Sequence, residues 1–117
     1  MKRVLLVDDS KSFLNALSYY LKSHNIEVSF SYSVDEALNE MEQQKFDLIC
    51  SDYNMGDKDG LYLLKYIRTK KDKTKFIMLT GNDSSELQQE VNKLDGLFLD
   101  KGNFNLAKLL LDEINKC

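Results

Sequence analysis

Short apolar runs alternate along the chain with segments whose apolar residues recur every three or four positions. The runs have the length of buried strands, and the recurring spacing is that of an amphipathic helix. This alternation repeats five times from one end of the chain to the other. We predict strands over residues 3–7, 27–32, 46–51, 75–80 and 96–100, each followed by a helix.

Polar residues that cap helices stand at the starts of the periodic segments. Ser10 suits the N-cap of the first helix, and Ser33–Glu36 has the pattern of a capping box for the second. The third helix is predicted to begin near Asp59, and Asp83–Glu86 to cap the fourth. Asn25 tolerates the left-handed conformation that often ends a helix. The residues predicted to face the core are Phe13, Ala16, Leu17, Tyr20, Leu21, Val34, Ala37, Leu38, Met41, Leu61, Leu64, Ile67, Leu87, Val91, Leu94, Leu106, Leu109, Leu110 and Ile114.

Strands that alternate with helices of this length form a parallel sheet covered by helices on both faces. Right-handed crossovers leave few topologies, and a first strand flanked by the second and third gives the order 2-1-3-4-5. The predicted fold class is therefore α/β, a flavodoxin-like doubly wound five-stranded parallel sheet built from five βα units. Residues 1–117 are predicted to form one domain. Ligands of such folds bind beyond the carboxyl ends of the strands, between the first and third strands.

The charge and the cysteine content narrow the function classes. A net charge of −3 disfavours nucleic acid as a partner, since nucleic-acid-binding proteins need a basic face. No apolar run approaches the ~18 residues of a membrane helix, and charge follows the short apolar run Val4–Val7, so we expect neither a membrane span nor a secretory signal. Cys50 lies in an apolar run and Cys117 is the last residue, which favours a reduced, cytoplasmic protein.

Ionic and hydroxyl side chains stand at the ends of four predicted strands. Asp8 and Asp9 follow the first strand and Asp52 follows the third. Thr80 ends the fourth strand, and Lys101 follows the fifth. Because the carboxyl ends of parallel strands share one edge, these side chains are expected to meet there. Two carboxylates about 4 Å apart repel by about 4 kcal/mol at an effective dielectric of about 20; Lys101 offsets one charge, and the remaining charge suits Mg²⁺. A carboxylate nucleophile, a hydroxyl, a lysine and Mg²⁺ are the components of phosphoryl transfer.

Taken singly, each of these residues has an ordinary structural explanation. Asp8 and Asp9 could complement a helix dipole, Thr80 could cap a strand end, and Phe98 on the fifth strand could be plain core. These explanations would have to coincide at one edge of one sheet, and we therefore favour a functional site.

Four sequence motifs resemble those of response-regulator receiver domains of two-component signalling. They are "VLLVDDS", "DLICSDYNM" with the "DG" that follows, "FIMLTG" and "LFLDKG", and the resemblance covers all 117 residues. It implies that Asp52 is the phosphoacceptor and that Mg²⁺ is the cofactor. The metal ligands it implies are Asp8, Asp9, Asp52 and the backbone carbonyl of Asn54, with Asp9 bound directly and Asp8 largely through metal-bound water. Thr80 and Lys101 are implied to contact the phosphoryl group. Thr80 and Phe98 are the implied switch residues.

The resemblance also implies the partners. A histidine kinase or a histidine phosphotransfer protein is expected to donate the phosphoryl group, and the domain catalyses only its own phosphorylation and dephosphorylation, so we do not class it as an enzyme. Phosphorylation is expected to switch binding of a downstream protein, through the face formed by the fifth strand and the helices on either side of it. We expect either a stand-alone, chemotaxis-type receiver or one excised from a larger protein, with no nucleic-acid or membrane partner of its own. His24 is expected on the surface, because the donor histidine belongs to the partner.

Two glycines stand where receiver domains usually have proline: Gly56 in the loop after the phosphoacceptor, and Gly102 after the lysine. Both are expected to loosen loops around the site. A cis bond before a residue other than proline costs about 2.5–4 kcal/mol, so we predict a trans Lys101–Gly102 bond, with Gly102 at positive φ. Asn54 and Asn82, each two residues past a site residue, are neutral, which predicts a phosphorylated lifetime of seconds to many minutes rather than hours.

Three other functions fit parts of the pattern. A haloacid-dehalogenase-type phosphatase also uses a strand-end aspartate, but it needs a second Asp two residues on, where this chain has Asn54. A flavin-binding module fits the fold, but "DDS" after the first strand would repel the flavin phosphate. The main alternative is a degenerate receiver that acts as a phosphorylation-independent protein-interaction module. The complete set of ionic and hydroxyl residues favours an active receiver over this alternative.

Overall fold

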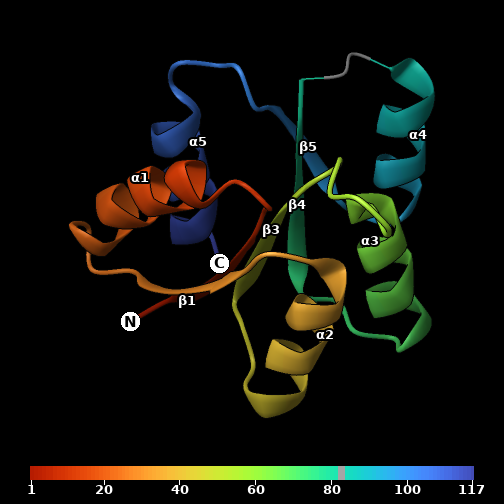
Figure 1. Ribbon diagram of the computed structural model, residues 1–117, viewed down its shortest axis with the longest axis horizontal. Helices are drawn as coiled ribbons and strands as arrows, with labels where there is room; N and C mark the ends of the chain where they lie inside the picture. The colour runs from red at the N-terminus through yellow and green to blue at the C-terminus, as the bar shows by residue number, and fades with distance from the viewer. Residues whose placement is uncertain (82–83) are drawn as a thin grey trace.

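The predicted sheet is present in the computed structural model, which describes residues 1–81 and 84–117 (Figure 1). Within those residues, five parallel strands lie in the predicted order β2-β1-β3-β4-β5. The strands are β1 (Arg3–Val7), β2 (Glu27–Ser31), β3 (Leu48–Asp52), β4 (Lys75–Thr80) and β5 (Leu97–Asp100). The third strand begins later than predicted and includes Asp52 as its last residue. The sheet, rather than the following loop, therefore holds the backbone of this aspartate.

The register aligns the carboxyl ends of β1, β3, β4 and β5. The backbone N–H of Asp8 continues the β1–β2 ladder by donating to the carbonyl oxygen of Ser31 at 3.0 Å. Asp52 ends β3, Thr80 ends β4, and Lys101 directly follows β5. These residues therefore lie along one edge of the sheet. The pairs that fix the alignment are Val7–Ser51, Asp52–Leu79 and Thr80–Asp100.

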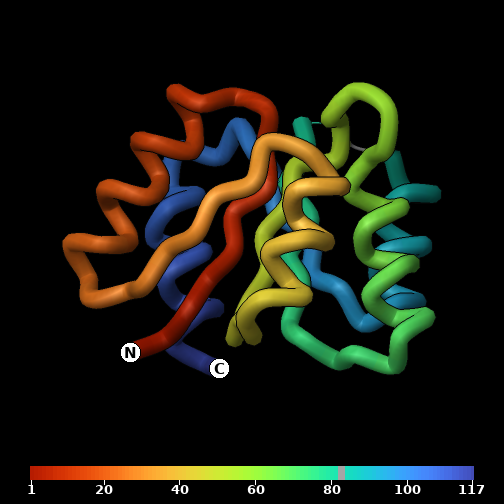
Figure 2. The backbone as a smooth tube through the Cα atoms, turned by 60° about the horizontal axis from the view of Figure 1, so that its bottom comes forward, coloured from red at the N-terminus to blue at the C-terminus, as the bar shows by residue number. Residues whose placement is uncertain are grey.

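Helices cover both faces of the sheet: α1 and α5 pack on one face, and α2, α3 and α4 on the other (Figure 1, Figure 2). They are α1 (Lys11–Lys22), α2 (Val34–Gln43), α3 (Gly60–Thr69), α4 (Ser85–Lys93) and α5 (Leu106–Asn115). Ser10, Ser33 and Asp59 cap the first three, as predicted, each accepting a backbone N–H from three residues on. Asp83, predicted to help cap α4, lies outside the described residues, and the observed N-cap is Ser84. None of the described helices is long and apolar enough to cross a membrane.

The strands β1, β3 and β4 are buried on both faces, which explains their continuous apolar runs. In β1, Val4 and Leu6 pack in the cluster with α1 and α5, whereas Leu5 and Val7 pack in the cluster with α2, α3 and α4. Cys50 is buried in the first of these clusters, as predicted. The site edge thus rests on two close-packed layers, which hold the strand ends in place.

Two predictions of core residues need correction. Ala16 is exposed, and the buried stripe of α1 consists of Leu14, Leu17, Ser18 and Leu21. That stripe also has helical spacing, and it prevails because burying Leu14 removes more apolar surface from water than burying Ala16 would. In α5, Leu109 is only half-buried, and Leu111 is buried instead.

Candidate functional site

Three aspartates at the carboxyl ends of two neighbouring strands, β1 and β3, meet at one edge of the sheet. Asp8 and Asp52 are buried, with 1% and 6% of their surface exposed, whereas Asp9 is exposed. One carboxylate oxygen of each lies within 4.8 Å of those of the other two. The turn after β1 supports this arrangement, because Asp8 Oδ1 accepts the backbone N–H of Ser10 at 2.9 Å and α1 starts directly beyond it. We call these three residues the acidic cluster.

Lys101 supplies a positive charge to the acidic cluster. Its backbone N–H donates to the carbonyl oxygen of Thr80 at 3.1 Å, which continues the β4–β5 pairing past the end of β5. Its ammonium nitrogen lies 2.7 Å from Asp8 Oδ2 and 3.4 Å from Asp52 Oδ2. Apart from this ammonium, no donor among the described residues satisfies Asp8 Oδ2. One positive charge therefore faces two buried negative charges, and its ion pair is tighter with Asp8 than with the predicted phosphoacceptor.

The buried charges perturb one another's ionisation. Burial and the negative charge of Asp8 raise the pKa of Asp52. Lys101 opposes that increase, as does the backbone N–H of Tyr53, which donates to Asp52 Oδ1 at 3.0 Å, but the pKa stays raised. Burial disfavours the charge on Lys101, yet both carboxylates outweigh it and raise the pKa of the ammonium. Burial, with the two carboxylates, also raises the pKa of the Cys50 thiol, so this thiol stays protonated. The edge thus holds more negative charge than Lys101 offsets.

The side chains of the acidic cluster fit a magnesium ion. All three offer hard carboxylate oxygens, which Mg²⁺ prefers, and the charge left after pairing with Lys101 suits a divalent cation. Asn54, whose backbone carbonyl is the fourth predicted ligand, lies in the exposed loop between β3 and α3, two residues after Asp52. Its role as a ligand stays a prediction.

Two glycines shape the loop between β3 and α3. Gly56 has a φ of +84°, a conformation that favours glycine and that proline cannot adopt, because the ring of proline fixes φ near about −65°. A Cβ atom on Gly60 would lie 2.5 Å from the carbonyl oxygen of Asp52 and 2.6 Å from the sulfur of Met78. Only a residue without a side chain lets the start of α3 approach the backbone of Asp52 this closely. Asp57, predicted to be solvated, is exposed.

The predicted switch residues lie on neighbouring strands and on one face of the sheet. Thr80 is buried, with 2% of its surface exposed, and Phe98 on β5 pairs in register with Met78 on β4. Thr80 and Met78 are two positions apart on the same strand, so their side chains share a face. Phe98 is half-buried and packs against the cluster beneath α2, α3 and α4. A movement of the Thr80 side chain can therefore affect the ring of Phe98 on the neighbouring strand.

The loop after Lys101 differs in part from the prediction. The Lys101–Gly102 bond is trans, as predicted, since no described residue has a cis peptide bond. The predicted positive φ at Gly102 is wrong, because Gly56 is the only described glycine in that region. The side chain of Asp100 makes the turn instead: its Oδ1 accepts the backbone N–H of Gly102 at 2.9 Å, two residues on. Asp followed two residues later by glycine is a local signal for such a turn, and it could have identified Asp100 from the sequence.

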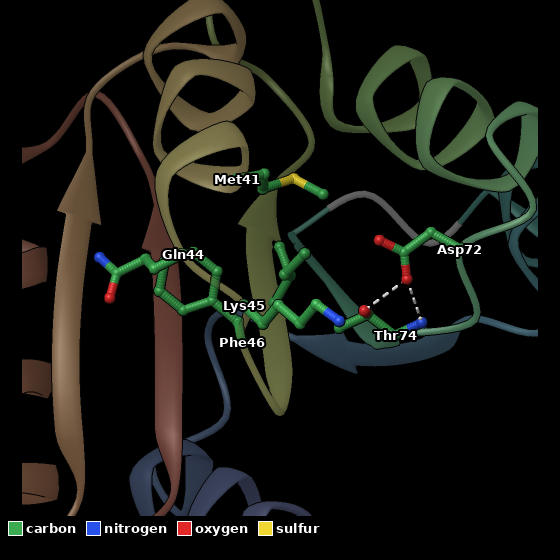
Figure 3. Close-up of a pocket in the computed structure, with 7 residues that line it drawn as sticks. Met41, Gln44, Lys45, Phe46, Asp72 and Thr74 are labelled. Carbon is green, nitrogen blue, oxygen red and sulfur yellow. Dashed lines mark hydrogen bonds between the residues drawn. The ribbon is translucent and has the colours of Figure 1, made fainter.

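A separate cavity of about 250 Å³ lies at the opposite edge of the sheet (Figure 3). Its lining residues come from the end of α2, from β3, and from the segments just before β3 and β4. They are Met41, Gln44, Lys45, Phe46, Ile49, Asp72 and Thr74. The carboxylate of Asp72 accepts hydrogen bonds from the backbone and the hydroxyl of Thr74. This cavity has a single, hydrogen-bonded acid and lies away from the acidic cluster, so the carboxyl edge remains the candidate for phosphoryl chemistry.

Proteins of known family resemble this chain in sequence. The family model for the response regulator receiver domain matches residues 4–109. The "Alkaline phosphatase synthesis transcriptional regulatory protein PhoP" of Bacillus subtilis is 31% identical over 97% of this chain and 45% of that protein. The "Two-component response regulator ARR11" of Arabidopsis thaliana is 33% identical over 76% of this chain and 18% of that protein. The chain thus spans less than half the length of these curated relatives.

The solved structures agree with the sequence relatives. The chemotaxis protein CheY4 of Vibrio cholerae superposes with a TM-score of 0.88 at 31% identity, covering 99% of this chain and 98% of that one. The receiver domain of the Francisella response regulator 1452 gives a TM-score of 0.91 at 26% identity, covering 99% and 95% of the two chains. The family match extends over most of the chain and takes in the acidic cluster and Lys101. This chain therefore belongs to the response regulator receiver domain family of two-component signalling.

Proposed function

We propose that this receiver domain accepts a phosphoryl group on a carboxylate oxygen of Asp52. The supporting observation is the placement of Asp52 itself: a buried carboxylate at the end of a central strand, within 4.8 Å of Asp8 and Asp9 and 3.4 Å from the ammonium of Lys101. Receiver domains of this kind interact with histidine kinases and downstream effectors. The phosphoryl donor proposed for this chain is the phosphohistidine of such a kinase, or of a histidine phosphotransfer protein.

The chemistry needs one bond to form and one to break. A carboxylate oxygen of Asp52 attacks the phosphorus atom, the bond between phosphorus and the histidine nitrogen breaks, and that nitrogen takes up a proton from solvent. Lys101 and Thr80 contact the phosphoryl oxygens and stabilise the charge on them. Bound Mg²⁺ would neutralise further charge on the transferring group. Asp9 would hold the ion directly, Asp8 largely through water, and Asn54 through its backbone carbonyl.

The consequence of phosphorylation is a change of surface. The phosphoryl group draws Thr80 toward Asp52, and the space beside Thr80 is taken by the ring of Phe98, which is half-buried before the reaction. The face affected is the one formed by α4, β5 and α5, and a downstream protein reads it. Burying or exposing the ring changes the free energy by about 1–3 kcal/mol, which is enough to shift the population of two conformations.

The direct test is incubation with a small-molecule phosphodonor and Mg²⁺, followed by intact mass and peptide mapping. We expect the addition of one phosphoryl group, at Asp52. The Asp52→Asn variant should take up none, and a chelator should abolish the reaction of the unaltered protein. Asp57→Asn is the matched control, because Asp57 is an exposed acid of the next loop outside the acidic cluster. Phosphate on another residue, or uptake by Asp52→Asn, contradicts the assignment; no uptake at all supports the degenerate receiver.

A further inference from the structure

The ammonium of Lys101 lies over an aromatic ring as well as beside carboxylates. Its nitrogen is 4.6 Å from the centroid of the Phe13 ring. Phe13 stands in the first turn of α1, and its backbone N–H donates to the N-cap oxygen of Ser10 at 3.4 Å. The turn that carries Asp8 therefore also fixes the ring under the lysine that pairs with Asp8.

This contact differs from the other lysine–ring contacts of the described residues. Four further lysines lie 5.3–5.8 Å from the centroid of a ring, so the Lys101 contact is the shortest of those found. Lys101 also differs because its ammonium faces two buried carboxylates. The attraction between a cation and the face of an aromatic ring is stronger when the cation is partly shielded from water. The side chain of Lys101 is 27% exposed, so it is shielded in this way.

The ring gives Lys101 a support that does not depend on the carboxylates. In the proposed reaction, the oxygens of Asp8 and Asp52 also interact with the metal ion and the phosphoryl group, so they are not free to hold the ammonium. The lysine stem is long and flexible, and the residue after it is glycine rather than a rigid proline. The face of the Phe13 ring interacts with neither group, so it can keep the ammonium at this edge of the sheet during the whole reaction.

We propose that Phe13 is a positioning residue, whose ring holds the Lys101 ammonium at the acidic cluster for phosphoryl transfer. This inference rests on the proposed function. The ring does not touch the reacting atoms in this role; it acts through the lysine, by restricting where the ammonium can go. The competing account is that Phe13 merely packs with the apolar cluster of α1 and α5, as Phe30 does. Leucine serves that packing role nearly as well, but it lacks the negative ring face.

Three variants separate the two accounts. Phe13→Leu keeps an apolar side chain and removes the ring face, and Phe13→Tyr restores the face. Phe30→Leu is the matched control: Phe30 is a half-buried ring of the same cluster, and the lysine over it is Lys22. The first measurement is the proton resonance of the Lys101 Cε methylene in the metal-free protein. The ring current of Phe13 should shift it upfield in the unaltered protein, Phe13→Tyr and Phe30→Leu, and the shift should vanish in Phe13→Leu.

The second measurement is the rate of phosphorylation by a small phosphodonor at saturating Mg²⁺. We expect Phe13→Leu to be roughly threefold to tenfold slower than Phe30→Leu, with Phe13→Tyr close to the unaltered protein. An unshifted Lys101 resonance in the unaltered protein, or equal rates in Phe13→Leu and Phe30→Leu, overturns the positioning role alone. Absence of phosphorylation in the unaltered protein overturns the proposed function and the positioning role together.

Discussion

The acidic cluster should destabilise the metal-free fold, and neutralising Asp52 should therefore stabilise it. The raised pKa of Asp52 means that folding favours its neutral form. Asn has nearly the same shape as that neutral form and keeps it at every pH. We therefore expect Asp52→Asn, which removes the proposed phosphoacceptor, to increase the free energy of unfolding at pH 7 in the presence of a chelator.

The distances in the site bound the size of this effect. At an effective dielectric of about 20, repulsion between the Asp8 and Asp52 oxygens, which lie within 4.8 Å of each other, is at least about 3.5 kcal/mol, and attraction between Lys101 and Asp52 across 3.4 Å is about 5 kcal/mol. These two contributions largely offset each other, so the burial of Asp52 decides the sign. A single stabilising substitution commonly yields about 0.5–2 kcal/mol, and we expect a gain in that range, equivalent to several degrees in Tm.

The dependence on pH gives the prediction its second test. A carboxyl group whose pKa is raised by folding destabilises the fold above that pKa, and the penalty is lost as the pH falls through it toward the unfolded value of about 3.9. The advantage of Asp52→Asn should therefore shrink to nothing on acidification. Mg²⁺ at a hundred times its Kd should stabilise the unaltered protein by about 2.7 kcal/mol, and it should stabilise the variant by less.

Urea unfolding, monitored by circular dichroism across a pH series with chelator or Mg²⁺, measures all three effects. Asp57→Asn is the control and should change the free energy of unfolding by less than about 0.5 kcal/mol, because Asp57 is exposed. If Asp52→Asn is no more stable than the unaltered protein at pH 7 without metal, the reasoning about burial and repulsion is wrong.

Three further predictions concern other parts of the site. Asp9→Asn should weaken Mg²⁺ binding more than Asp8→Asn, because the former residue is proposed to bind the ion directly; equal Kd values in calorimetric titrations contradict this. Gly60→Ala places a Cβ atom 2.5 Å from a carbonyl oxygen of β3, so urea unfolding should show a loss of about 1–3 kcal/mol together with slower phosphorylation, and an unchanged variant would mean that α3 shifts freely. Asp100→Ala removes the acceptor of the Gly102 N–H and should cost about 0.5–1.5 kcal/mol, whereas Asp100→Asn keeps an acceptor and should cost little.

The sequence predicts the fold and the edge at which the acidic cluster gathers, because both follow from local patterns. Apolar runs in β1, β3 and β4 indicate strands buried on two faces, and strands separated by helices must be parallel. The carboxyl ends of parallel strands lie at the same edge of the sheet, whichever face the intervening helices cover. Asp8, Asp52 and Lys101 could thus be placed together before their distances were known.

Properties that depend on exact packing are not predictable in this way. The rotation of α1 about its axis decides that Leu14 rather than Ala16 is buried, and neighbouring helical stripes look alike in the sequence. The contact between Phe13 and Lys101 joins residues from opposite ends of the chain, and nothing local to either one signals it. The need for a left-handed residue falls at Gly56, in a loop whose path depends on how α3 packs against β3.

The unequal distances from Lys101 to the two buried carboxylates matter for the chemistry. Asp8 is buried and lies 2.7 Å from the ammonium of Lys101. The ammonium therefore stabilises mainly the carboxylate of Asp8, which is not the proposed nucleophile. Asp52 lies 3.4 Å from the same ammonium, and its pKa is raised rather than lowered. A carboxylate fully paired with a cation would be a weak nucleophile, since its electrons are already stabilised. Because Asp8 takes the tighter ion pair, Lys101 compensates the charge of Asp52 only in part, and a bound divalent cation would supply the remaining positive charge.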